Sequence, residues 1–365
     1  MRSDKSPGSA RPVVLGLLSR YALAILGAAL IGVGVFVALM MVQTDGVTLT
    51  GDLGLEPRVI RALPEGSEVD ARTALFRVAN SANPFPTADK PCDKGDLPVN
   101  PYPLQVRDSP GFTLRGGLFS GAVPLESDWE DTYCNSAGIL LRDGIDGSIE
   151  APRLRRVWDA IRITEGTSGF HLRGAWISEV RDDCIENDYL NGGLVEDSLL
   201  DGCFSGLSMR APDGEERLAT GGPFVLRGVL MRMQSYLYKA ELHEGPPLKV
   251  DESQAEIEVY DSILVMEDRS PVSQSRLSIG WSRIGKCSGN LLLWTADTPW
   301  PRKFTPPPDC FQIVEGEEAR ALWQKARRNW IDCHPLTQRF EDDPISDTTA
   351  CDPAAPGGPS AESSQ

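Results

Sequence analysis

The chain has 365 residues, a formal net charge of −16 at pH 7 and eight cysteines. Such an acidic chain repels nucleic-acid phosphates, so we expect no nucleic-acid partner. The cysteines form no C-x-x-C pair and no Cys/His cluster with zinc spacing. We therefore expect disulfides in an oxidising compartment and no metal bound by thiols.

A stretch without charged residues covers 21–42, and at helical rise its 22 residues cross about 30 Å of hydrocarbon. Basic residues precede it, at Arg2, Lys5, Arg11 and Arg20. The positive side stays cytoplasmic, so we predict a cytoplasmic segment at 1–20, a single transmembrane helix at 21–42 in the inner membrane, and the remainder in the periplasm or outside the cell. A cleavable signal peptide is the alternative, although no small-residue cleavage site follows the apolar stretch.

Beyond the predicted helix, residues 43–109 are rich in Pro and Asp and show weak periodicity, so we expect a linker and an N-terminal cap there. The pattern changes at residue 110. The string Phe-x-Leu-Arg-Gly begins at Phe112, Phe170 and Phe224, and short apolar strands with Gly and Asp turns lie between the copies. A period of about two dozen residues with short strands predicts an all-β solenoid, a right-handed parallel β-helix, over 110–295.

Two columns of apolar residues alternate along the chain when the repeats are aligned. The first column contains Leu114, Ile149, Leu172, Val195, Leu226 and Val259. The second contains Ile139, Ile161, Ile185, Leu207, Leu237 and Leu277.

Charged residues give an independent test of this register. Directly after the first column stand Arg115, Glu150, Arg173, Glu196 and Arg227, whose signs alternate. Coils of a β-helix lie about 4.8 Å apart, so each charge would lie between two opposite ones. The same alignment pairs Arg162 with Glu186 and Asp188 with Arg210.

The C-terminal part has a different character. Residues 315–330 place Leu322, Trp323, Ala326 and Trp330 on one helical face, and we predict a C-terminal cap with this helix over 296–340. Residues 341–365 are dominated by Asp, Pro, Ser, Gly and Ala, and we expect a disordered tail there.

The coil length and the string Arg-Asp-Asp-Cys-Ile-Glu-Asn-Asp at 181–188 resemble the pectate-lyase-like superfamily of right-handed β-helices. The resemblance covers about 110–295 and implies a protein that binds or processes a polysaccharide, as a hydrolase or lyase if it is an enzyme. Of the polygalacturonase-type motifs only the Asp-Asp is present, at Asp182 and Asp183. The Gly-His-Gly and Arg-Ile-Lys motifs are missing.

The alignment stacks Asp159 on Asp183, followed by Ser205, Ser235 and Ser275. Two carboxylates on adjacent coils repel if both are charged, so a raised pKa or a cation must compensate. Glycoside hydrolysis uses such a pair, and Asp159 and Asp183 are the candidate catalytic residues. The structural alternative is that these Asp and Ser side chains accept main-chain hydrogen bonds and hold turns.

Candidate substrate-binding residues surround this pair. Asp182 and Arg210 flank it, and Tyr236 and Tyr238, expected on one face, offer rings for sugar stacking. We expect no dedicated metal site and no cofactor, with calcium left open. His171 is interpreted as a packing residue.

Two function classes follow. The first is an anchored protein that binds or cleaves a polysaccharide at Asp159, Asp183 and Arg210. The second is a scaffold without catalysis, whose surface contacts another envelope protein.

Overall fold

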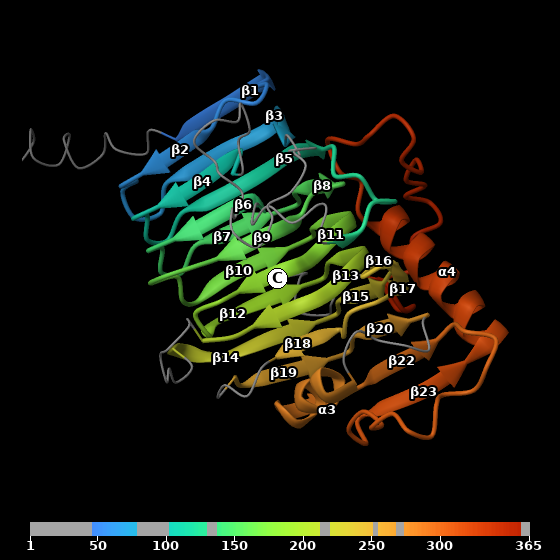
Figure 1. The fold of residues 1–365 in the computed structure, drawn as a ribbon. Helices are drawn as coiled ribbons and strands as arrows, with labels where there is room; N and C mark the ends of the chain where they lie inside the picture. The colour runs from blue at the N-terminus through green and yellow to red at the C-terminus, as the bar shows by residue number, and fades with distance from the viewer. Residues whose placement is uncertain are drawn as a thin grey trace, which may run out of the picture. The chain divides into compact units, whose positions relative to one another are not determined.

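A computed structural model of the chain describes residues 46–78, 102–129, 137–211, 220–250, 255–267 and 274–358. In these ranges the chain winds into a solenoid of parallel strands (Figure 1). The strands stack coil on coil in three ladders, which we name A, B and C in the order that the chain visits them. The N-terminal coils hold strands long enough to serve two ladders, and β11 and β13 do the same further on.

Ladder A begins with the first halves of β1 (Val47–Asp52), β3 (Glu68–Val78) and β5 (Thr113–Gly121), and continues through β7 (Ser148–Glu150), β10 (Phe170–Arg173), β12 (Asn191–Glu196), β14 (Thr220–Arg227), β19 (Ile257–Tyr260) and β21 (Ile284–Ser288). Ladder B takes the second halves of β1, β3 and β5, then β8 (Arg153–Arg155), the first halves of β11 (Trp176–Asn187) and β13 (Leu199–Met209), β15 (Leu230–Met233), β20 (Ile263–Met266), β22 (Asn290–Trp294) and β23 (Phe311–Glu315).

Ladder C contains β2 (Arg58–Arg61), β4 (Leu104–Arg107), β6 (Ala137–Arg142), β9 (Asp159–Ile163), the second halves of β11 and β13, and β18 (Leu248–Val250). An antiparallel hairpin, β16 (Tyr236–Tyr238) with β17 (Glu241–His243), leaves the solenoid between β15 and β18. Two helices complete the described elements, α3 (Gln274–Ser282) and α4 (Gly316–Cys333).

Ladder A confirms the first predicted column in full. Its paired residues run from Leu114 through Ile149, Leu172, Val195 and Leu226 to Val259, and all six are buried in the core. The alternating charges next to them lie in the predicted register, and ion pairs join Arg115 to both Glu68 and Glu150 and Arg227 to Glu196. Alternation along each strand places one side chain in the core and the next one outside.

Ladder C confirms the second column only as far as Leu207. Ile139, Ile161, Ile185 and Leu207 are stacked in that order, but the next partner of Leu207 is Leu248. Leu237 lies in the hairpin, and Leu277 lies on α3, where its side chain still reaches the core. The hairpin interrupts the spacing of the repeat. Counting residues from Leu207 therefore gave Leu237 in place of Leu248.

The solenoid also begins earlier than predicted. Parallel pairing starts at Val47, within the segment 43–109 that was expected to be a linker and cap. The Pro- and Asp-rich stretch 79–101 separates β3 from β4 in the sequence and so obscures the repeat.

Helix α4 lies close to its predicted position, but it covers a side of the solenoid and not the end (Figure 1). Its buried residues Trp323, Ala326 and Trp330 pack on the outward side chains of ladder B. Those side chains include Trp176, Leu199, Leu230, Ile263 and Leu293. These outward positions of ladder B are apolar because α4 covers them, whereas Asp201 and Arg232, two residues further along the same strands, form an ion pair.

The expected disorder of the tail is wrong for residues 341–358. Asp343 forms an ion pair with the buried Arg153 at 2.8 Å, and Asn329 of α4 exchanges hydrogen bonds with Asp352. A disulfide, Cys333–Cys351, closes the same region. Polar and small residues here are ordered by specific partners. Residues 359–365 lie outside the described residues.

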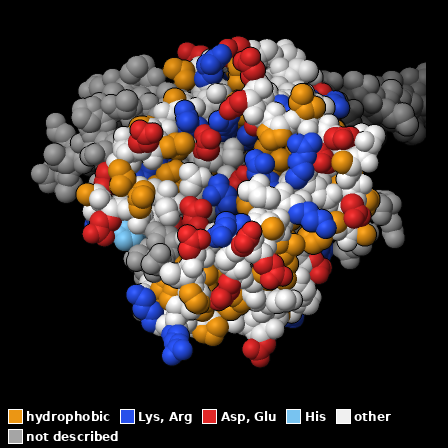
Figure 2. All heavy atoms as spheres, turned by 90° about the vertical axis from the view of Figure 1, so that its right-hand side faces the viewer, with side chains coloured by type: hydrophobic (Ala, Val, Ile, Leu, Met, Phe, Trp, Pro, Cys, Tyr) orange, Lys and Arg blue, Asp and Glu red, His pale blue; other side chains and the backbone are white. Residues whose placement is uncertain are grey.

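The face that carries α4 shows acidic and basic side chains interspersed among apolar ones (Figure 2). Interleaved signs give this face little long-range attraction for a polymer of one charge. Electrostatic steering of a charged partner is therefore not expected from this side.

Expected disulfides are present at the six described cysteines: Cys184–Cys203, Cys287–Cys310 and Cys333–Cys351. The first two link neighbouring coils. Among the described residues no helix is long and apolar enough to cross a membrane, and the predicted span at 21–42 lies outside them.

Candidate functional site

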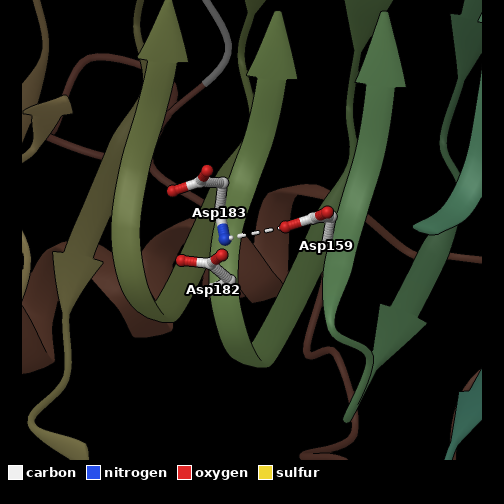
Figure 3. Close-up of side chains that lie close together, drawn as sticks. All are labelled: Asp159, Asp182 and Asp183. Carbon is white, nitrogen blue, oxygen red and sulfur yellow. Dashed lines mark hydrogen bonds between the residues drawn. The ribbon is translucent and has the colours of Figure 1, made fainter. Parts of the chain in front are cut away.

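The candidate site lies where ladder B passes into ladder C. Asp159 opens β9, and Asp182 and Asp183 lie in β11 at a register shift against β13. Such a bulge redirects side chains. The main-chain N–H of Asp183 donates to Asp159 Oδ1 at 3.1 Å, so the two residues lie on neighbouring coils as predicted (Figure 3).

The three aspartates form one cluster from two coils. The side chain of Asp159 points toward the main chain of β11, while the side chains of Asp182 and Asp183 extend to the side away from Asp159 (Figure 3). Each offers a carboxylate oxygen, and these oxygens lie within 4.8 Å of one another. All three residues are buried.

The predicted serine column continues for one residue only. Ser205 pairs with Asp183 in the ladder, but the next coil brings Gly245 against it. A Cβ at Gly245 would lie 2.3 Å from Ser205 Oγ, so the absent side chain makes room. Ser235 and Ser275 are elsewhere, next to Glu267 and on α3.

Lys249 places a positive charge beside the negative charges of the cluster. The register predicted from the sequence did not bring Lys249 to this position. Its Nζ lies 2.9 and 2.7 Å from the two carboxylate oxygens of Asp183 and 3.6 Å from Asp182 Oδ1. Lys249 pairs in the ladder with Ser208, which pairs with Glu186. Because the Ser208 side chain is small, the Lys249 side chain can pass over it to the coil that carries Asp183. The string Leu-Lys-Val at 248–250 was the signal, since its central residue points outward from a core strand.

Arginines bind the remaining acids of this face. Arg162 contacts Glu186 at 2.9 Å and Asp188 at 3.1 Å, and Arg210 contacts Asp188 at 2.7 Å. Both predicted pairs are thus confirmed, with Arg162 joining them into one network. Charged groups in such a partly buried network are held by several partners at once.

Burial dominates the protonation of the cluster. It raises the pKa of Asp159 well above its ordinary value, and the negative charges of Glu186, Asp182 and Asp183 raise it further. Burial and the charge of Asp182 raise the pKa of Asp183 to about 7, against the opposing effect of Lys249. Asp159 also forms a side-chain hydrogen bond with Glu186, which raises its pKa further.

Burial and neighbouring charges act in opposite directions on the pKa values of the other groups. Burial raises the pKa of Glu186 although Arg162 opposes the shift. Burial also acts to raise the pKa of Asp188, yet the hydrogen bond and charge of Arg210 and the charge of Arg162 hold it below its usual value. Burial would lower the pKa of Lys249, but the charges of Asp182 and Asp183 raise it, so the ammonium is retained.

A pocket of about 210 Å³ opens over this network. Its polar lining comprises Asp159, Asp182, Glu186, Ser205, Arg210, Lys249 and Arg276. Its aromatic lining comprises Trp129, Trp158, Phe204 and Tyr238, and Gly245 and Pro246 complete it. Three carboxyl groups, one of them with a strongly raised pKa, and four aromatic rings thus line one small space.

Two segments outside the repeat build the aromatic wall. Trp129 follows the turn after β5, and Tyr238 comes from the hairpin. Their rings meet edge to face at 5.8 Å, and Trp129 lies 5.3 Å from Trp158. The wall is therefore formed by contacts between distant segments.

Arg181 and Asp128 tie these segments together. Arg181 Nη2 donates to the carbonyl oxygens of Ser127 and Leu237, one in each segment. The carboxylate of Asp128 accepts from the main-chain N–H of Lys239 at 3.2 Å. Burial lowers the pKa of Arg181 to about 10, which still leaves it charged at neutral pH.

Of the predicted substrate-binding residues, Asp182, Arg210 and Tyr238 line the pocket. Tyr236 shares a face with Tyr238, as predicted, since both rings lie against Phe204, but it is not part of the pocket lining. It is buried, and its hydroxyl donates to the carbonyl oxygen of Gly202 at 3.0 Å. The two tyrosines belong to a hairpin and not to a coil, and only Tyr238, at the end of β16, reaches the pocket.

The aspartate cluster also bears on the calcium expectation. Its oxygens are the ligand type that calcium prefers, but calcium takes about six to eight of them. Lys249 Nζ already brings a positive charge to Asp182 and Asp183. A calcium ion would compete with this ammonium for the same carboxylates.

No protein-family model, curated protein or solved structure gives a significant match to the chain. The likeness to the pectate-lyase-like superfamily thus stays a prediction from the repeat pattern.

Proposed function

We propose that this chain is an extracytoplasmic, right-handed parallel β-helix protein, anchored by residues 21–42, which binds a glycan and acts on it in the pocket at Asp159. The observation that carries the proposal is the lining of the pocket: a carboxyl group with a raised pKa beside further carboxylates, within aromatic walls.

Three features support the proposed location outside the cytoplasm, the membrane anchor and the right-handed winding of the β-helix. Disulfides between coils fit an oxidising compartment outside the cytoplasm. The uncharged stretch 21–42, with basic residues before it, fits a single anchor. Crossovers between parallel strands are right-handed in nearly all proteins.

The walls of the pocket suit a sugar. Aromatic rings offer large apolar faces to the C–H face of a pyranose, while carboxylates accept from its hydroxyls. The volume of about 210 Å³ is below the ~300–1,000 Å³ usual for drug-sized ligands. The pocket therefore takes one sugar unit, at a chain end or at a branch.

For catalysis, Asp159 is the proton donor in this proposal, because its pKa is raised and it lines the pocket. Asp182 is the second carboxylate, since Asp183 is bound by Lys249. The closest carboxylate oxygens lie within 4.8 Å. Inverting glycosidases need carboxyl groups ~6.5–9.5 Å apart to admit a water, whereas retaining ones use ~5–5.5 Å. The two carboxyl groups are therefore closer than an inverting mechanism needs.

The scaffold function is the second candidate, and the ion pairs favour it. Asp183, Glu186 and Asp188 are each bound by a lysine or an arginine, as in a network that holds coils together. In that case the pocket would do no chemistry, and the partner would be another envelope protein.

The deciding experiment incubates the full-length protein, in detergent, with a panel of acidic, neutral and amino-sugar polysaccharides, with and without calcium. Its variants are Asp159→Asn and Asp182→Asn, with Asp188→Asn as matched control, because Asp188 belongs to the same network but does not line the pocket. New reducing ends or unsaturated products, lost in the first two variants and kept in the third, are expected. Neither turnover nor retention of any glycan would favour the scaffold.

A further inference from the structure

Asp182 is the acid of the network without a hydrogen-bond donor. Its side chain is only 10% exposed and lines the pocket, and its nearest described cation is Lys249 at 3.6 Å, beyond hydrogen-bond distance. No hydrogen bond to its carboxylate is made by the residues that the structure describes. A buried carboxylate left without donors is costly, so a ligand that donates to it would be stabilised.

A second polar atom at the pocket has the same property. Ser205 is 1% exposed, and its Oγ has no hydrogen-bond partner in the described ranges. Buried hydroxyls are normally paired. The pocket therefore contains two polar groups without a hydrogen-bond partner in the described ranges, the carboxylate of Asp182 and the hydroxyl of Ser205, and a ligand would pair with both.

The cations of the pocket are already committed to other acids. Lys249 is bound by Asp183 with two contacts, and Arg210 by Asp188 with two. Arg276 lies exposed on α3 at the rim, where solvent screens it. The network therefore offers Asp182, and not a cation, to a ligand.

The aromatic walls suit the same charge. Trp129, Trp158, Phe204 and Tyr238 line the pocket, and ring faces attract a cation within about 6 Å of their centroids. Aromatic walls beside a carboxylate that accepts no hydrogen bond are an arrangement that recognises ammonium groups. A quaternary ammonium could not donate to Asp182, whereas a primary ammonium can.

We propose that the pocket recognises a hexosamine unit with a free amine. Its ammonium would bind Asp182, its ring would lie against the tryptophans, and a hydroxyl would pair with Ser205. This rests on the proposed glycan function and narrows it to a de-N-acetylated amino sugar, because an N-acetyl group removes the charge and adds bulk.

The test is titration calorimetry of the full-length protein, in detergent, with three oligosaccharides of equal length: glucosamine oligomers, their N-acetylated forms and cello-oligosaccharides. The glucosamine oligomers are expected to bind at least tenfold more tightly than either of the others. Asp182→Asn should reduce this preference to within twofold, and Asp188→Asn should retain it. Circular dichroism checks that each variant is folded.

The outcomes separate the two proposals. Equal binding of all three oligosaccharides overturns the amino-sugar inference and leaves the glycan function standing. Binding of none overturns both. If Asp182→Asn does not fold, the comparison of the three ligands on the unaltered protein still decides.

Discussion

Lys249 holds Asp183 with contacts of 2.7 and 2.9 Å although 66 positions separate them in the sequence. Replacing Lys249 with Met would leave the buried Asp183 without its counter-charge, and we expect a loss of about 3 kcal/mol in the free energy of unfolding at pH 8. Because the pKa of Asp183 lies at about 7, protonation should reduce this defect at pH 5. Urea unfolding at both pH values measures it.

A double variant controls for lost packing. Lys249→Met with Asp183→Asn should recover part of the stability, since no buried charge is then unpaired. A defect that is equal at both pH values and not relieved by Asp183→Asn would count against the ion pair as the cause.

The protonation of Asp159 predicts a pH dependence. A carboxyl whose pKa is higher in the folded than in the unfolded chain takes up a proton on folding, so stability falls as the pH rises from about 4 toward the folded-state value. Asp159 and Asp183 both have raised pKa values. We expect the free energy of unfolding to fall by the order of 2 kcal/mol from pH 5 to pH 8.

Asp159→Asn should flatten this dependence, because an amide does not titrate. Lys249 adds nothing in this window, since its raised pKa lies well above it. Asp188, whose pKa is lowered, contributes stability that is lost only at acidic pH. An unchanged slope between pH 5 and pH 8 in the Asp159→Asn variant, measured by urea unfolding, would refute the assignment.

The register of ladder C predicts unequal effects of two leucines. Leu248 stacks on Leu207 and is 1% exposed, whereas Leu237 lies in the hairpin and is only half-buried. Leu248→Ala should cost about 2–5 kcal/mol, as large-to-small changes in a core do. Leu237→Ala should cost clearly less. Thermal unfolding of both variants measures the two losses. Equal losses would support the register predicted from spacing, in which Leu237 follows Leu207.

The tail predicts a change in proteolysis. Asn329 donates to the carbonyl oxygen of Asp352 and accepts from its N–H, both at 2.9 Å. Asn329→Ala leaves these main-chain groups unpaired, at a cost of about 1–3 kcal/mol. Under reducing conditions, which open Cys333–Cys351, the variant should be cut after residue 341 faster than the unaltered chain. Thr349→Ala, on the exposed part of the tail, is the control and should not be cut faster.

The repeat itself could be predicted from the sequence. Each coil contacts only its neighbours, so the position of Leu172 between Ile149 and Val195 is encoded in local alternation and spacing. The charges that follow report the same register, since Arg173 must lie between Glu150 and Glu196. The adjacency of Asp159 and Asp183 followed from this alignment as well.

Only the tertiary structure decided the rest of the site. The hairpin at 236–243 breaks the count, so spacing could not bring Lys249 to the face that carries Asp183. Trp129 and Tyr238 come from segments outside the repeat, and Arg181 and Asp128 join those segments across the fold. Stacking is a nearest-neighbour property that sequence periodicity records, whereas the pocket depends on where insertions fold back, and that is set by contacts between residues far apart in the chain.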